Sequence, residues 1–143
     1  MRKLMPFAAL SLLACAFVTP TALADNAPST PAATPSPAGA KVSIVEPKNG
    51  AVVTSPFKVV FGISGMQVAP AGTQTANTGH HHLLIDNPQV DMSKPLPATE
   101  QIKHFGKGQT ETTLTLAPGQ HTLQLLFADW KHQPFNPSVE SDK

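Results

Sequence analysis

The chain has 143 residues with ten Lys or Arg, nine Asp or Glu, six His and a single cysteine. This balanced charge provides no basic face for phosphates, so we expect no nucleic-acid partner. The one cysteine, Cys15, excludes a disulfide or a zinc finger within the chain.

Residues 1–24 are predicted to be an export signal. Arg2 and Lys3 are followed by an apolar stretch over 4–18, and Ala22-Leu23-Ala24 has the small-x-small pattern of a cleavage site, so we expect cleavage before Asp25. The stretch is short for a membrane span. The sequence therefore predicts a soluble periplasmic protein without a membrane span. Lipidation at Cys15 after an earlier cut is the alternative.

Residues 25–40 are almost only Ala, Pro, Ser and Thr. Such a segment has little apolar surface to bury, and its prolines favour extended conformations. We expect a disordered linker here. After cleavage, eight lysines and no arginine remain.

The folded domain is predicted to span 41–143, which suffices for one modest core. Short alternating segments separated by Pro, Gly and Asn indicate strands. They fall at Val42–Glu46, Phe57–Ser64, His81–Asp86, Thr110–Leu116 and His121–Asp129, with an edge piece at Val52 and Val53. The pattern predicts an all-β, antiparallel immunoglobulin-like β-sandwich.

Two turn sequences support this prediction. Pro47-Lys48-Asn49-Gly50 indicates a tight turn, and Ala117-Pro118-Gly119-Gln120 predicts a hairpin between adjacent strands. No window predicts an amphipathic helix. We expect the last strand of the sandwich to be missing, because the chain stops soon after Val139.

The most informative motif is the run of three histidines at positions 80–82. In a strand, alternate residues face opposite sides, so His81 shares the core side with Leu83 and Ile85. His80 and His82 point together to the other side, with side-chain origins about 6 to 7 Å apart. This spacing suits two ligands of one metal ion. His121 is in phase with the core row of the last predicted strand, and could meet His81 at one end.

Imidazole is a common ligand of copper, zinc and nickel, and no thiolate competes in the exported chain. The sequence therefore predicts a transition-metal site, with copper preferred and zinc second. Asp86 is a further possible ligand, whereas calcium is disfavoured because no acidic loop is present. Whether there is one site or two stays open at this point. The candidate ligands are His80, His82, His104, His81, His121 and His132.

Other functions compete with this one. The histidines could form a structural or pH-sensitive network, or serve a metal-dependent enzyme with Glu111 or Asp86 as acid or base. No non-metal catalytic motif is present, and we assign no catalytic residue. The third class is a non-catalytic envelope module that binds a protein or a polysaccharide, with Trp130 and Phe135 as its anchors or as plugs of the sandwich.

Three motifs together resemble a known family. They are Gly79-His-His-His-Leu-Leu-Ile-Asp86, His104-Phe-Gly-Lys-Gly-Gln-Thr-Glu111 and Leu116-Ala-Pro-Gly-Gln-His-Thr-Leu-Gln124. This chain resembles the domain of unknown function 4399 (DUF4399), small exported bacterial proteins. The resemblance implies an exported domain marked by histidine motifs, without an established activity. It also implies a last strand after Val139, which this chain lacks.

Overall fold

The computed structural model describes residues 32–143. The predicted export signal and the first part of the predicted linker lie outside these residues. The described chain forms eight strands and no helix, so it contains no helix that could cross a membrane. The strands are β1 (Lys41–Glu46), β2 (Phe57–Ser64), β3 (Gln67–Val68), β4 (Thr78–Ile85), β5 (Ile102–His104), β6 (Glu111–Leu114), β7 (Leu123–Ala128) and β8 (Pro134–Glu140).

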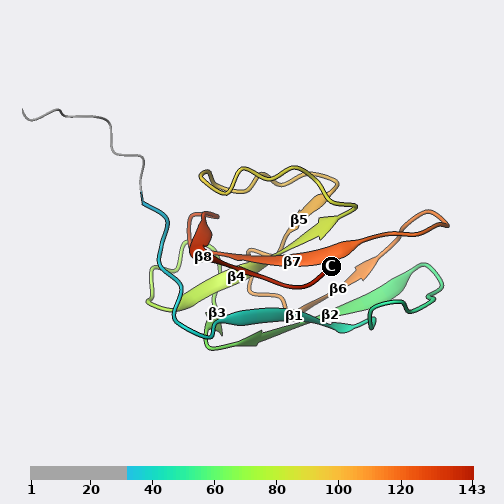
Figure 1. Ribbon diagram of the computed structural model, residues 1–143, viewed down its shortest axis with the longest axis horizontal. Coiled ribbons are helices and arrows are strands. Elements are labelled where there is room, and N and C mark those ends of the chain that lie inside the picture. The colour runs from blue at the N-terminus through green and yellow to red at the C-terminus, as the bar shows by residue number, and fades with distance from the viewer. Residues whose placement is uncertain (1–31) are drawn as a thin grey trace, which may run out of the picture. The chain divides into compact units, whose positions relative to one another are not determined.

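The strands form two facing sheets, seen edge-on in Figure 1. One sheet has the order β1-β2-β6, and the other has the order β3-β4-β7-β8 with β5 also paired to β4. The fold is thus a single all-β sandwich, as the sequence predicts. All named pairs are antiparallel except β3 with β4, which is parallel.

The main core fills the space between the sheets. Val59 and Phe61 of β2 pack there with Leu83 of β4 and with Leu125 and Phe127 of β7. These side chains alternate along their strands with residues that point away from the core. Burial of such apolar surface stabilises the sandwich by roughly 25 cal/mol per Å².

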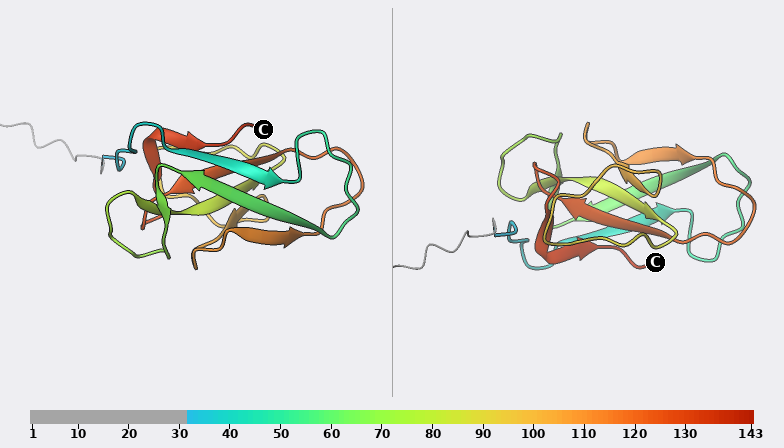
Figure 2. Two further views of the ribbon diagram at one scale, coloured as in Figure 1. Left: turned by 90° about the horizontal axis from the view of Figure 1, so that it is seen from below. Right: turned by 90° about the horizontal axis from the view of Figure 1, so that it is seen from above.

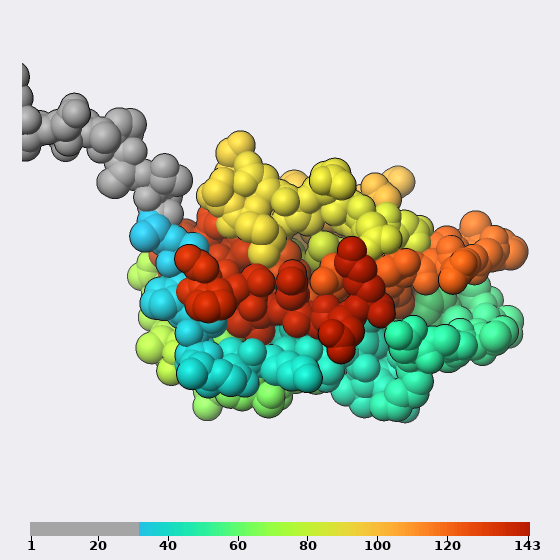
Figure 3. Space-filling model, in the orientation of Figure 1, coloured from blue at the N-terminus to red at the C-terminus, as the bar shows by residue number. Residues whose placement is uncertain are grey.

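β4 lies inside its sheet and is buried along its whole length. Its second face carries a smaller apolar cluster, in which Leu84 meets Leu126 and Ala128 of β7. The segment between β4 and β5 covers this face and contributes Leu96 to the cluster. Figure 3 shows this segment, in yellow, as a separate layer over the sheet. The outer face of β4 is therefore also enclosed.

Several local predictions were wrong. Val52 and Val53 form no strand, and Val52 is fully exposed. The turn at 117–120 does not close a hairpin, because β6 and β7 belong to different sheets; the connection between them is at one end of the sandwich in Figure 2. β8 is a strand where none was predicted.

Part of the predicted linker contacts the domain. Pro35 forms a parallel bridge with Asn136 of β8, and the Asn136 amide donates to the carbonyl of Thr34 at 3.0 Å. The Ser36 hydroxyl donates to the carbonyl of Pro137 at 2.8 Å. Residues 34–36 therefore run alongside β8.

Candidate metal centre

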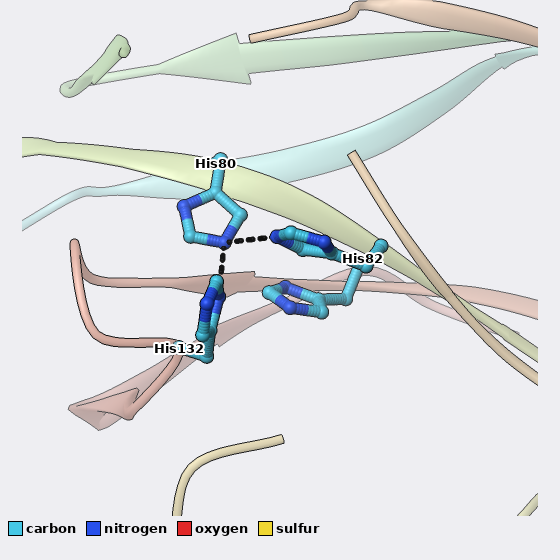
Figure 4. Close-up of side chains that lie close together, drawn as sticks. His80, His82 and His132 are labelled. Carbon is cyan, nitrogen blue, oxygen red and sulfur yellow. Dashed lines mark hydrogen bonds between the residues drawn. The ribbon is translucent and has the colours of Figure 1, made fainter. Parts of the chain in front are cut away.

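β4 places two imidazoles on its outer face. Because side chains alternate, His80 and His82 point together away from the core, and they are 0% and 1% exposed. Their ring centroids are 4.8 Å apart. The prediction that these two rings project to the same side of the strand is confirmed, and Figure 4 draws them.

β5 brings a third imidazole to the same face. In the antiparallel pairing of β4 with β5, His82 lies directly opposite His104. Opposite residues of neighbouring strands project to the same side of a sheet. The two ring centroids lie 5.1 Å apart. A register shift of one residue would remove His104 from this face.

A tight turn after β7 supplies the fourth imidazole. His132 has a φ of 69°, in the left-handed region that few side chains adopt. The buried carboxylate of Asp129 holds this turn by accepting from the amides of Lys131 at 3.0 Å and Gln133 at 2.9 Å. It also accepts from the hydroxyl of Thr34 at 2.6 Å. Charge-assisted bonds of this kind fix the turn and with it the direction of His132.

The ring nitrogens converge on one point. Nε2 of His80 lies 2.9 Å from Nδ1 of His132 and 3.2 Å from Nε2 of His104. An imidazole nitrogen carries either one hydrogen or one lone pair in the ring plane, so it makes one well-directed hydrogen bond. Nε2 of His80 therefore cannot satisfy both neighbours. A cation between the rings would accept all of their lone pairs.

Burial leaves other nitrogens in need of a partner. Nδ1 of His80 and both ring nitrogens of His82 are buried without a hydrogen bond. Burial lowers the pKa of His80 to about 4, with the neighbouring His132 and His104 acting in the same direction. Burial lowers the pKa of His82 to about 2, with His80, His104 and His132 acting in the same direction, and burial lowers the pKa of His104. These three rings are therefore neutral at pH 7, the form that binds metals.

The four rings make a complete ligand set. One nitrogen from each ring lies within 4.8 Å of the others. Two nitrogens bound to one ion at 2.0 Å and at tetrahedral angles are about 3.3 Å apart, close to the spacings around His80. The histidine cluster, as we call this group, consists of His80, His82, His104 and His132.

His81 lies apart from the histidine cluster. Its ring faces the main core, with centroids 5.1 Å from Phe61 and 5.0 Å from Phe127. Neither ring nitrogen forms a hydrogen bond of good geometry, and burial lowers the pKa of His81 to about 4, an effect reduced by the nearby backbone of Gln109 and Gly62. The position of His81 makes it part of the core.

His121 also lies apart, and it does not meet His81. Its Nδ1 donates to Asp86 at 2.9 Å, and its Nε2 donates to the carbonyl of Ala117 at 2.8 Å. The hydrogen bond to Asp86 raises the pKa of His121. Asp86 is therefore engaged in an ion pair outside the histidine cluster. Glu111, the other acid considered from sequence, pairs with Lys58 at 2.7 Å.

The two aromatic candidates differ in exposure. Phe135 is 3% exposed and belongs to the main core, whereas Trp130 is 38% exposed on the turn that carries His132. The function of Asp129 could not be predicted from the sequence, because the role of an acidic residue at a strand end depends on the backbone amides that fold around it. The short spacing from Asp129 to His132 was the available signal.

Comparison with family models gives a match to "Domain of unknown function (DUF4399)" over residues 59–143. This range contains all four residues of the histidine cluster. Comparison with curated proteins and with solved structures found no match. The chain therefore belongs to the DUF4399 family.

Proposed function

We propose that the protein binds one transition-metal ion through the histidine cluster. The observation that supports this best is the convergence of His80, His104 and His132 on one point, with nitrogens 2.9 and 3.2 Å apart. Both ring nitrogens of His82 are also buried without a partner, which costs about 1 to 3 kcal/mol for each atom, and a bound ion would engage one of them.

The chemistry of the ligands supports copper first and zinc second. All four donors are imidazole nitrogens, which suit both metals, and affinity rises toward copper in the usual order of divalent ions. Asp129 is the carboxylate whose charge acts on His80, and its oxygens are occupied by Thr34 and by backbone amides. Asp129 is therefore not available as a further ligand, and the donor set consists of imidazole nitrogens alone.

We propose a role as buffer, carrier or sensor component rather than as enzyme. Four protein ligands fill a tetrahedral ion, whereas catalytic sites usually keep one position open. His104 and His132 reach solvent and offer the path by which an ion would enter or be passed to a partner protein. The predicted export signal over residues 1–24 supports a periplasmic location. Recovery of the protein from the periplasm with Asp25 as its first residue would test this location.

The test of metal binding is native mass spectrometry of the purified protein with Cu⁺, Cu²⁺ or Zn²⁺, one at a time. We expect one tightly held ion. His104→Ala and His132→Ala should weaken binding, while the control His121→Ala, outside the histidine cluster, should bind as the wild type does. Failure of the folded wild type to hold any ion would refute the proposal.

A further inference from the structure

The backbone of Gly106 lies directly against the ring of His104. A methyl group built on its Cα would lie 2.5 Å from Nε2 of His104 and closer still to Cε1. Real Cβ atoms do not approach other atoms so closely. Nε2 of His104 is the nitrogen that faces His80. Any side chain at position 106 would therefore press on the donor atom itself.

Backbone conformation does not explain a glycine at this position. Gly108, two residues later, has a φ of 80°, which favours glycine, whereas Gly106 is not among the residues with positive φ. A left-handed backbone is therefore not the reason for glycine at position 106. The space needed by the His104 ring is thus the reason for glycine that the structure provides.

The loop around Gly106 has little freedom to move away. The amide of Ala71 donates to the carbonyl of Gly106 at 2.8 Å, and Cβ of Ala71 would lie 3.3 Å from the added methyl group. The preceding residue, Phe105, is buried in the main core and receives a hydrogen bond from Gly108 at 3.1 Å. With the backbone held on both sides, the imidazole ring is the part that would shift.

We propose that Gly106 is a positioning residue of the metal site, which lets the ring of His104 lie close against the loop and direct Nε2 into the histidine cluster. This proposal rests on the proposed function. It concerns the residue that determines whether the ion has four imidazole ligands or three.

The test is a double-mutant cycle with Gly106→Ala, His104→Ala and the combined variant, titrated with Zn²⁺ and Cu⁺ against a chelating competitor. Gly106→Ala should weaken binding by about tenfold to a hundredfold, as is usual when a residue that orients a ligand is lost. In the His104→Ala background the same change should have no further effect. The absorption of bound Co²⁺ should report the same loss of one nitrogen ligand in Gly106→Ala and His104→Ala.

Gly62→Ala is the matched control. Gly62 also lacks a positive φ, and its added methyl group would lie 2.8 Å from the Ser43 hydroxyl, away from the histidine cluster. It should leave metal affinity unchanged. Wild-type affinity in Gly106→Ala, or an equal loss with and without His104, would overturn the proposal.

A folding arm separates this proposal from metal binding itself. In the absence of metal, Gly106→Ala should lower the urea midpoint more in the His104 background than in the His104→Ala background, because removing the ring removes the clash. If Gly106→Ala and the combined variant both fail to fold, the glycine serves the backbone and the proposal is wrong. If the wild type binds no ion but the clash is measured, the metal-binding function fails and Gly106 keeps only a steric role beside the ring of His104.

Discussion

Nε2 of His80 and Nδ1 of His132 lie 2.9 Å apart, although 52 positions separate the two residues in the chain. His80 lies within β4, whereas the position of His132 depends on the five-residue turn 129–133 between β7 and β8. The metal site that we propose therefore combines a fixed ligand pair on β4 with ligands whose positions depend on local turn geometry.

Replacement of His132 should weaken metal binding without affecting folding. We expect His132→Ala to fold as the wild type does and to lose at least about tenfold in affinity for Zn²⁺ or Cu⁺, because one of four donors is removed. Competition titration measures the affinity, and thermal unfolding with and without metal measures the coupling. A metal-induced rise in melting temperature equal to that of the wild type would contradict this expectation.

Asp129→Asn should weaken the turn that carries His132. The variant keeps the side-chain shape but loses the charge that accepts from Lys131, Gln133 and Thr34. Hydrogen bonds to a charged group contribute about 1.5 to 3 kcal/mol, so we expect a loss of this order in unfolding free energy.

The same variant should also bind metal more weakly, provided that His132 is present. Thr34→Val, which removes only the hydroxyl donor, should have a smaller effect in the same direction. An equal loss of affinity from Asp129→Asn in the His132→Ala background would show that Asp129 acts by another route.

His81 should make the fold sensitive to acid. The pKa of His81 is about 4 in the folded protein, compared with an ordinary value of 6.5. As the pH falls, the unfolded chain is therefore protonated at His81 before the folded protein is. Stability is then complete above pH 6.5 and falls as the pH decreases toward 4, by about 3 kcal/mol.

His81→Leu should remove this part of the pH dependence while leaving metal binding intact. Urea unfolding of both proteins at several values between pH 4 and 7 gives the two slopes. An unchanged slope in the variant would mean that His81 does not stay neutral in the fold.

The ion pair of His121 with Asp86 should stabilise the fold in a limited pH window. The pKa of His121 is raised from 6.5, so its contribution is present at low pH and is lost as the pH rises through the folded value. The pKa of Asp86 is lowered from 3.8 by His121 and by the amide of Thr122, so its contribution is lost as the pH falls through the folded value. The pair is therefore complete between the two ordinary values.

Asp86→Asn should accordingly cost more stability at pH 5.5 than at pH 8.5. Glu111→Gln is the control, since its partner Lys58 has a raised pKa and stays charged throughout this range. Chemical unfolding at the two pH values compares them. The same cost of Asp86→Asn at both would show that His121 does not titrate in the window.

The sequence predicted best the parts of the fold where alternation continues over many residues. β2, β4 and β7 were found, and the opposite faces of His80 and His81 were assigned correctly from period two alone. Very short strands were missed, because β3 and β5 offer too few residues to show a period. β8 was missed because Pro134 and Pro137 argue against a strand.

The composition of the histidine cluster required three-dimensional information. The sequence named its four residues among six candidates but could not separate them from His81 and His121. His104 is the last residue of β5 and His132 lies in the turn between β7 and β8, so alternation does not predict where either ring points. Their positions depend on the β4–β5 register and on the left-handed backbone of His132. Neither feature can be recognised from the periodicity of the sequence.

The contact of residues 34–36 with β8 determines the end of the sandwich at which the chain enters the domain. The chain enters beside the turn that carries His132, since Thr34 binds Asp129, while the turn before His121 lies at the other end of the sandwich (Figure 1). The described chain thus joins the sandwich at the end nearest His132. The connection between β1 and β2 lies at the opposite end, away from this point of entry (Figure 1).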